Sequence, residues 1–517
     1  MRKTIKLLLL VLLTSNFILG QNNNAVKSIS QINTIEESVY LHCNTTTILC
    51  GETLLYKIYA LNTTQKKFSS ISKIGYVELL DESNQSVMKQ KIALKNGTGQ
   101  GDYFITTSLK TGNYKLVTYT NWTRNKKDKG IYKTDIFIVN PFERLPLKES
   151  EGVKSSEKSF ANNIQSEKKE STPEPGNITI LAKTDKTKYA FREKISLTLS
   201  SESKNDIKGN FSVSVRKKDS LPLGRPITSV DFLNLAAVEN GSNIEKSKFL
   251  PELRGEIISG RIVAINNSND LKDKTVSLSI PGKNFGMKLT KTDESGKFNF
   301  ILDDVPETSG AIIQIIGKDR NDYTIELNEM SSPDFSKLIV LNPLWVHSKN
   351  KSDLEQRSIA NQVENNYYQQ KKDSLLHNQK TPAFYHSLEK EYILDDYTRF
   401  PTLKETIIEI LAGVYYTKNE QGYTIHLRDS YGQSDAYGET MVMVDGLIIE
   451  DANELFDYDM QNIYKVSLVN RGYVYGPKVF NGIINFITKK NDFQTKASGN
   501  FIKTVTLDRP QAGKKYF

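Results

Sequence analysis

Beyond its first twenty residues this sequence has no long apolar run, and it has almost no cysteine. No later stretch approaches the about 18 consecutive apolar residues that a transmembrane helix needs. We therefore expect no transmembrane segment in the mature chain. The two cysteines, Cys43 and Cys50, are too few for a disulfide framework or a cysteine-rich zinc site. In an exported chain they either form a disulfide with each other or remain two free buried thiols, and the sequence leaves both alternatives open.

Catalytic and cofactor motifs are also missing. The five histidines are scattered without metal-ligand spacing. A phosphate-binding loop, a dinucleotide fingerprint and a Gly-x-Ser-x-Gly elbow are absent. Cys50-Gly51-Glu52-Thr53 approaches an internal thioester motif, but Thr53 stands where the acyl-donating glutamine is needed. We expect no enzyme, no cofactor and no bound metal, although a carboxylate pair assembled in space would leave no sequence motif.

A strong excess of one charge is missing as well. The formal net charge is +9, and Arg2, Lys3 and Lys6 contribute three of these charges before the first domain begins. The remaining Lys and Arg residues form no stripe, which argues against nucleic-acid binding. These three charges precede the apolar run Leu7–Leu13 and the small residue Gly20, a pattern typical of a signal peptide at residues 1–20. We expect an exported protein, periplasmic or outer-membrane-associated, and an uncleaved anchor is the alternative.

Strand signals dominate the rest and predict a mainly β chain, with tandem immunoglobulin-like β-sandwiches followed by a small α/β domain. Tyr56–Leu61, Tyr76–Leu80 and Tyr114–Tyr119 are rich in β-forming residues and are separated by Gly, Asn, Asp and Ser clusters. They predict a first β-sandwich over residues 25–141. Residues 142–176 are dominated by Lys, Glu, Ser and Asn, which predicts a disordered linker.

Two further β units follow the linker. Ile178–Leu181, Ile195–Leu199 and the alternating segment Phe211–Val215 predict a second β module over residues 177–250 that repeats the first. Strand signals continue over residues 251–335 and predict a third unit, again a β-sandwich.

Residues 336–395 are polar and predict a partly helical linker. Ser352–Glu355 has the pattern of a capping box at a helix start. Ile359, Val363 and Tyr367 then recur every four residues and form one apolar stripe. We expect this stripe to pack on a neighbouring domain.

Residues 396–495 mix helix and strand patterns. A second capping box at Thr402–Glu405 predicts a helix that Gly413 ends, and a short helix is predicted at Ala452–Phe456. Four strands are predicted in this unit: Tyr423–Leu427, Thr440–Val444, Ile463–Val469 and Ile483–Thr488. Residues 496–517 are expected to form a tail.

Several short blocks of the three predicted β units follow family patterns. Through Gly51–Tyr56, Val77–Asp81 and Gly112–Leu116 the first unit resembles the macroglobulin-type β-sandwich of α-macroglobulins and related bacterial surface proteins. Residues 184–195 are similar to the start of a second such module. Through Gly260–Val263 and the turn residues 292–298 the third unit resembles carboxypeptidase-regulatory-like domains, which implies an accessory β-sandwich without catalysis.

Five blocks of residues 396–495 keep the order and spacing of another family: Leu411–Val414, Ile425–Arg428, Met443–Gly446, Ile463–Val466 and Asn481–Lys489. This unit is similar to the plug of TonB-dependent receptors. The resemblance implies structural roles for the plug-motif residues Gly413, Asp445, Gly446, Gly476, Gly482, Thr488 and Lys489. Asp445-Gly446 is a dipeptide typical of a type I′ turn. Fewer than thirty residues follow Lys490, so we expect no membrane barrel and no pore from this chain.

These patterns favour a non-enzymatic binding or scaffold protein of the cell envelope. Its sandwich edges would accept strands of partner proteins, which we expect to be envelope proteins, an outer-membrane barrel receptor among them, and not nucleic acids. One alternative is an accessory subunit of TonB-dependent outer-membrane transport. Another is a macroglobulin-type protease-binding protein without a thioester.

Overall fold

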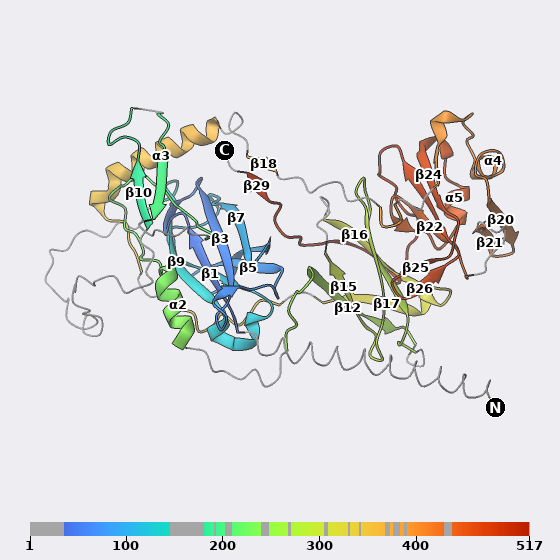
Figure 1. Ribbon diagram of the computed structural model, residues 1–517, viewed down its shortest axis with the longest axis horizontal. Helices are drawn as coiled ribbons and strands as arrows, with labels where there is room; N and C mark the ends of the chain where they lie inside the picture. The colour runs from blue at the N-terminus through green and yellow to red at the C-terminus, as the bar shows by residue number, and fades with distance from the viewer. Residues whose placement is uncertain are drawn as a thin grey trace, which may run out of the picture.

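The computed structural model describes thirteen stretches of the chain: residues 36–144, 180–190, 193–201, 209–238, 248–266, 270–303, 309–328, 331–340, 343–367, 373–375, 383–386, 390–428 and 437–515. The predicted signal peptide and nearly all of the predicted linker 142–176 lie outside these residues. The described part is mainly β, as the sequence predicts. Figure 1 shows a first β body in blue, a second in olive, and an α/β body in orange and red.

The first body is a β-sandwich of two sheets. The first sheet holds β1 (Glu37–Cys43), β3 (Thr53–Asn62), β4 (Lys67–Phe68) and β7 (Thr98–Phe104). The second has the order β2 (Thr47–Leu49), β9 (Tyr132–Val139), β8 (Gly112–Tyr119), β5 (Ile74–Leu80) and β6 (Ser86–Ala93). A 3-10 helix, η1 (Thr123–Gly130), connects β8 to β9. The three strands that the sequence predicts here are therefore confirmed as parts of β3, β5 and β8.

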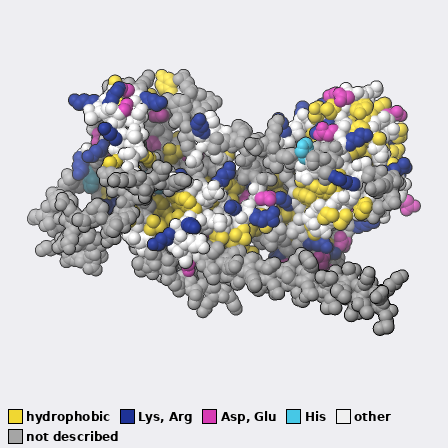
Figure 2. Space-filling model, viewed as in Figure 1, with side chains coloured by type: hydrophobic (Ala, Val, Ile, Leu, Met, Phe, Trp, Pro, Cys, Tyr) yellow, Lys and Arg dark blue, Asp and Glu magenta, His cyan; other side chains and the backbone are white. Residues whose placement is uncertain are grey.

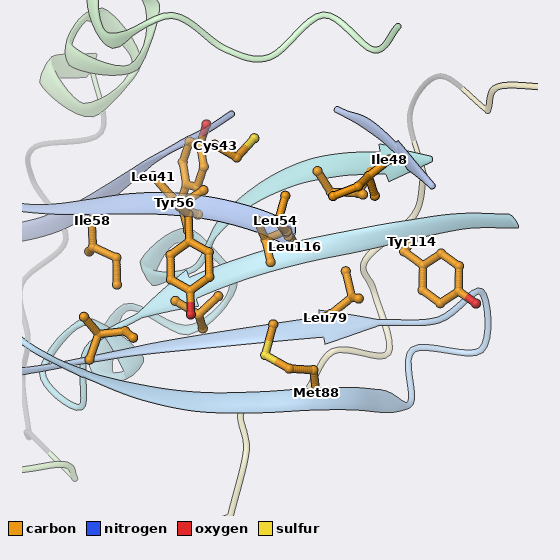
Figure 3. Close-up of a cluster of buried hydrophobic side chains, with 14 of the residues drawn as sticks. Leu41, Cys43, Ile48, Leu54, Tyr56, Ile58, Leu79, Met88, Tyr114 and Leu116 are labelled. Atoms are coloured by element: carbon orange, nitrogen blue, oxygen red, sulfur yellow. The ribbon is translucent and has the colours of Figure 1, made fainter. Parts of the chain in front are cut away.

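Alternation along β3 builds the core of this sandwich. Leu54, Tyr56 and Ile58 point inward and are almost fully buried, while the residues between them are partly exposed. Figure 3 shows these side chains meeting Leu79 and Leu116 of the opposite sheet. Two-sided burial of this kind removes apolar area from water and is the main stabilisation of the unit.

The two cysteines are free in the structure, so the disulfide alternative is not realised. Both side chains are buried in the core of the first sandwich. The Cys50 thiol points to the carbonyl oxygen of Leu109, at 3.6 Å, and not to Cys43. Burial raises the pKa of each thiol to about 11, so both are protonated and unreactive at neutral pH.

The second macroglobulin-like module predicted over residues 177–250 is not a sandwich in the described residues. Only a hairpin of β10 (Ile180–Thr184) and β11 (Leu197–Ser201) and the helix α2 (Ser229–Val238) form there. Phe211–Val215 is extended but pairs with no strand, and Val215 is 76% exposed. The prediction of a half-buried strand is therefore wrong.

Residues 209–238 instead lie against the first sandwich. The hydroxyls of Thr46 and Tyr40 donate to the carbonyl oxygens of Gly224 and Ile227, at 2.9 and 3.2 Å. Phe232 of α2 packs on the ring of Tyr40, with 5.3 Å between ring centroids. These contacts hold the segment on the surface of the first sandwich, so it does not need a hydrophobic core of its own.

The second body is a β-sandwich of seven strands. One sheet has the order β15 (Lys297–Leu302), β12 (Glu256–Ala264) and β17 (Tyr323–Leu327). The other has the order β14 (Gly286–Lys291), β13 (Thr275–Ile280), β16 (Gly310–Ile316) and β28 (Ile502–Thr506). The predicted turn joins the two sheets between β14 and β15, where the Asp293 carboxylate accepts the N–H of Ser295 and of Lys297. A short 3-10 helix, η2 (Arg320–Asp322), precedes β17.

The α/β body is built on one mixed sheet. Its order is β19 (Lys390–Ile393), β24 (Ile463–Val469), β27 (Ile483–Thr488), β22 (Met441–Val444) and β23 (Leu447–Ile448). Two hairpins flank it: β20 (Val414–Asn419) with β21 (Gly422–Leu427), and β25 (Tyr473–Tyr475) with β26 (Lys478–Phe480). Its helices are α4 (Leu403–Glu409), α5 (Asn453–Phe456), η5 (Leu394–Asp396) and η6 (Met460–Asn462). The predicted strands and both predicted helices are confirmed, and the Thr402 side chain caps α4.

Apolar residues cover both faces of this sheet. One face packs on α4 and α5 through residues such as Leu403, Leu455 and Phe486. The other face, with Met441 and Met443, packs on Met287 of the second sandwich. Parallel pairing of β22 with β27 fits this two-sided burial, because parallel strands rarely face water.

Residues 343–367 form η3 (Ser348–Asn350) and the sixteen-residue helix α3 (Lys351–Asn366). Ser352 does not cap the helix as predicted, because the helix begins two residues earlier, at Lys351 after Asn350. The predicted apolar stripe is also misplaced: Ile359 is 61% exposed, and Val363 and Tyr367 are about half exposed. The opposite, polar face of α3 packs on the first sandwich.

The predicted tail is not a tail. Residues 499–515, which we call the strap, leave the α/β body, add β28 to the second sandwich and continue to the first. Figure 1 shows the strap as a red trace that runs from beside β16 to β29 (Lys514–Lys515). There β29 pairs with β18 (Ser374–Leu375). Within the described residues, no helix is both long and apolar enough to cross a bilayer.

Candidate binding sites

A cleft of about 790 Å³ lies between the first sandwich, residues 215–219 and α3. We call it the α3 cleft. Three elements form its walls. They are the turn around Gly51, the extended segment that carries Arg216 and Lys217, and the helix face that carries Arg357 and Asn361. Most of these side chains are polar or charged, so the cleft suits a hydrophilic ligand or a polypeptide segment more than an apolar cofactor.

Arg357 is the central charge of the α3 cleft. Its Nε and Nη2 atoms donate to the two carboxylate oxygens of Glu52 at 2.7 and 2.8 Å, and its Nη1 atom donates to Asp219 at 3.1 Å. Burial alone would lower the pKa of Arg357, but the two carboxylates outweigh it and raise that pKa. The bidentate geometry joins the helix to the sandwich, and it leaves the guanidinium charge compensated.

Amide side chains continue this contact along α3. Asn361 and Asn365 donate to the carbonyl oxygens of Cys50 and Gly51 at 3.2 and 2.9 Å. Gly51 has φ of +94°, and a Cβ placed on it would lie 2.6 Å from the Asn361 amide nitrogen. The positive φ favours glycine at this turn, and a side chain here would displace the Asn361 amide.

The second candidate site is the edge of β16 that the strap fills. In the register of the pair, Ala311 lies opposite Val505 and Ile313 lies opposite Lys503. The ladder extends past β28, since the Ile315 N–H donates to Phe501 O at 2.9 Å and the Leu507 N–H donates to Ser309 O at 2.7 Å. Phe501 and Leu507 are buried in the core of the second sandwich. The strap is thus a true strand of this sandwich in both hydrogen bonding and packing.

Beyond β28 the strap meets a buried ion cluster between the two sandwiches. The Glu256 carboxylate lies 2.7 Å from Lys91 Nζ and 3.2 Å from Arg509 Nη1, and the three side chains are less than a tenth exposed. Lys91 also donates to the carbonyl oxygen of Asp508 at 2.7 Å. One carboxylate of the second sandwich therefore binds a cation from the first sandwich and a cation from the strap.

The end of the strap is held by polar contacts with β7. The Gln511 amide donates to the Asp102 carboxylate at 2.9 Å, and Lys514 Nζ lies 2.8 Å from the same carboxylate. The Gln511 N–H donates to Lys91 O at 2.7 Å. These bonds place the strap across the first sandwich without burying apolar area.

Glu252 adds a titratable group to the same junction. Its carboxylate accepts the Tyr76 hydroxyl at 3.0 Å and the Ile257 N–H at 3.3 Å. Burial raises its pKa to about 7, the two hydrogen bonds oppose that rise, and the nearby Glu256 charge adds to it. Its charge therefore changes near neutral pH.

The plug-motif residues gather at the ends of the α/β sheet. Asp445 has φ of +48° and Gly446 φ of +87° in the two-residue turn between β22 and β23, as a type I′ turn requires. The buried Asp445 carboxylate accepts the N–H and the hydroxyl of Thr488 at 2.8 and 2.7 Å. The Lys489 N–H donates to Asn462 O at 2.9 Å. These contacts hold β22, β27 and η6 together.

The glycines of the plug motif share a backbone conformation that favours glycine. Gly413, Gly476 and Gly482 all have positive φ. A Cβ on Gly446 would lie 2.4 Å from the Phe285 ring of the second sandwich, and one on Gly482 would lie 2.3 Å from Val469 O. These positions serve packing, and the assignment of the unit to the plug family stays a prediction.

Sequence reasoning missed both candidate sites. The α3 cleft depends on Arg357 and Glu52, which belong to no motif. The strap did carry a signal, because Val505 and Leu507 alternate with polar residues, as strand residues do. Within the described residues, no three His, Cys, Asp or Glu side chains are grouped as metal ligands.

Comparisons with known proteins add little beyond this geometry. No protein-family model and no curated protein match the chain. Among solved structures it is similar to Escherichia coli alpha-2-macroglobulin, with 9% identity and a TM-score of 0.18 over 57% of this chain. Salmonella alpha-2-macroglobulin has 9% identity and a TM-score of 0.17 over 60%, and Listeria innocua beta-glucosidase has 14% and 0.14 over 20%.

The chain spans only a small part of these proteins. It covers 14% of the Escherichia coli macroglobulin, 15% of the Salmonella macroglobulin and 16% of the glucosidase. Likeness at these TM-scores carries no argument about the function of this chain.

Proposed function

We propose that this chain is an exported, non-enzymatic binding and scaffold protein of the cell envelope, periplasmic or outer-membrane-associated. The observation that carries the proposal is the addition of β28 to β16, because a strand from a distant part of the sequence completes an existing sheet there. Strand addition obtains affinity from main-chain hydrogen bonds and specificity from the side chains at alternate positions. A protein whose sheets are completed this way is suited to bind extended segments of partner proteins.

The charges of the candidate sites support binding over catalysis. Arg357 is compensated by Glu52 and Asp219, and Glu256 is compensated by Lys91 and Arg509. A catalytic acid or base must reach a proton on a substrate. Groups held in such pairs position segments of chain instead.

The proposal is tested by fractionation followed by cross-linking in intact cells. A photo-reactive residue at the exposed position Val215, on the rim of the α3 cleft, should capture a specific envelope protein. The matched control places it at exposed Ile265 of the second sandwich, which does not line the α3 cleft. Recovery of the mature chain from the cytosol, or the same products from both positions, would contradict the proposal.

A second candidate function is that of an accessory subunit in TonB-dependent outer-membrane transport. It is favoured by an apolar surface on the α/β body, at the right of Figure 2. Val474 and Val479 lie opposite each other across the β25–β26 hairpin and are 71% and 45% exposed. Contiguous exposed apolar surface marks sites of protein–protein interaction. Co-purification with an outer-membrane barrel in mild detergent, lost in Val474→Asp and kept in the exposed-surface control Ile265→Asp, tests this candidate.

A further inference from the structure

We propose that the strap is a resident ligand of a strand-binding groove, and that the groove accepts an extended strand of a partner protein with the same pattern. The groove consists of the β16 edge and the Glu256 carboxylate. This inference rests on the proposed binding function and names the surface and the class of partner.

The edge of β16 needs a strand beside it. Five of its seven residues are buried, and its sequence, Gly310–Ile316, is almost entirely apolar. An unpaired apolar edge strand would recruit other chains. The other neighbour of β16 is β13, so β28 is what covers its free side.

The groove selects side chains at defined positions. Phe501 and Leu507 are buried in the sandwich, and Val505 between them is partly buried. Lys503, Thr504 and Thr506 are exposed. The groove therefore takes apolar side chains at the positions of Phe501, Val505 and Leu507, whereas the position of Lys503 stays exposed and accepts a polar residue.

A buried carboxylate that pairs with a cation of the strap follows the apolar positions. Arg509 enters the junction two residues after Leu507 and meets Glu256. The carboxylate is almost fully buried, so a partner without a cation here would leave it with Lys91 alone. The partner that fits is an extended segment with apolar residues at the positions of Phe501, Val505 and Leu507, followed by an arginine two residues later.

The strap completes the sandwich with a short strand. Its strand has five residues, three of them exposed, and its remaining bonds to the first sandwich are polar. Because it is part of the same chain, its effective concentration at the groove is about millimolar or higher. A partner strand competes with it only where the strap is weakened or the partner is locally concentrated.

The register identifies a substitution that weakens the strap alone. Lys503 lies opposite Ile313 at a hydrogen-bonded position of the ladder, so its N–H faces β16. Lys503→Pro removes this donor without removing a buried side chain. Thr504→Pro is the matched control, because the N–H of Thr504 faces away from β16.

The probe is a fluorescent peptide that copies residues 499–512, added to the full chain and followed by anisotropy. We expect the peptide to bind the Lys503→Pro chain about tenfold more tightly than the wild-type or Thr504→Pro chain. A peptide with glutamate in place of Arg509 should bind the Lys503→Pro chain about tenfold more weakly than the copy. Equal binding to all three chains, or no binding to a Lys503→Pro chain that melts cooperatively, would overturn the proposal.

A reversible disulfide, which we call the lock, shows whether the Lys503→Pro chain binds the peptide at the β16 edge. Gly310 and Thr506 face each other at a non-hydrogen-bonded position and are both exposed, and a Cβ on Gly310 meets nothing within 4 Å. Cysteines at these two positions suit a disulfide. In the Lys503→Pro chain, oxidation of this pair should abolish peptide binding and reduction should restore it. Peptide binding that is the same in the oxidised and the reduced chain would contradict the proposal.

Sedimentation distinguishes the other possible occupant, a second copy of the chain. A Lys503→Pro chain that exchanges straps into a dimer and leaves no groove open to the peptide would overturn the partner-strand proposal. A monomer that binds the peptide supports it. Because these measurements use purified protein, a failure here is distinct from a failure of the envelope proposal, which the cell fractionation tests.

Discussion

The two β-sandwiches of this chain are completed in different ways. The first builds both of its sheets from residues 37–139, so all of its strands come from one continuous stretch of the chain. The second takes its last strand from residues 502–506, beyond the whole α/β body. A sandwich that depends on a distant strand couples its stability to the domains between, whereas a contiguous one can stand alone.

The largest effect is expected in the core of the contiguous sandwich. Leu54→Ala removes a fully buried side chain from β3 and should lower the free energy of unfolding by about 4 kcal/mol. Trp122 is buried beside this sandwich and Trp345 is partly exposed, so tryptophan fluorescence during urea unfolding reports chiefly on it. The exposed control Leu375→Ala should change little. Unchanged unfolding in Leu54→Ala would show that the first sandwich is not the independent unit described.

The next effect tests the junction on which the second sandwich depends. Lys91→Met leaves the buried Glu256 carboxylate with Arg509 as its remaining cation, and should cost about 3 kcal/mol. Hydrogen exchange should show faster exchange in β16 and β28, and little change in β3. Equal loss of protection in both sandwiches would mean that they unfold as one unit and would remove the contrast between them.

A smaller effect concerns pH. The folded pKa of Glu252 is raised from 4.5 to about 7, so the folded chain binds this proton more tightly than the unfolded chain. Stability at this junction is therefore highest below pH 4.5 and falls as pH rises toward about 7. Glu252→Gln keeps an acceptor for Tyr76 and should reduce the loss between pH 5 and pH 8 by roughly 2 kcal/mol. Urea unfolding at the two pH values measures this, and identical slopes for both chains would contradict it.

The smallest effect is expected at the end of the strap. Lys514→Met breaks an ion pair with Asp102 that is partly exposed, so the cost should be about 0.5 kcal/mol. The same substitution type at Lys91 is expected to cost several times more, because that pair is buried. Comparable unfolding free energies for Lys91→Met and Lys514→Met would show that burial does not distinguish the two contacts.

Local patterns predicted the strands well where alternation and turn residues agreed. Tyr76–Leu80, Tyr114–Tyr119 and Ile483–Thr488 are strands where the sequence places them, and Asp445-Gly446 forms the expected two-residue turn. Phe211–Val215 alternates equally well but has no strand partner. Alternation indicates an extended segment that is able to pair, but it does not show whether a partner strand lies beside it.

The helix α3 shows a second limit of pattern reading. Ile359, Val363 and Tyr367 form the stripe that amphipathicity assigns to the buried side, yet they are exposed. The acceptors that hold the other face, the carbonyl oxygens of Cys50 and Gly51 and the Glu52 carboxylate, belong to a turn three hundred residues away. Hydrogen bonds to a distant backbone leave no hydrophobic period, so the orientation of the helix could not be predicted.

By itself the sequence determined that the chain is mainly β, where most strands begin and end, and which turns need positive φ, because these follow from side-chain period and local backbone sterics. Only the tertiary structure decided that the strap completes the second sandwich, that α3 presents its polar face inward and that Cys43 and Cys50 stay apart. These outcomes depend on pairings between residues far apart in the sequence. Such pairings are chosen by the summed hydrogen bonding, packing and charge of the whole fold, and no single segment encodes them.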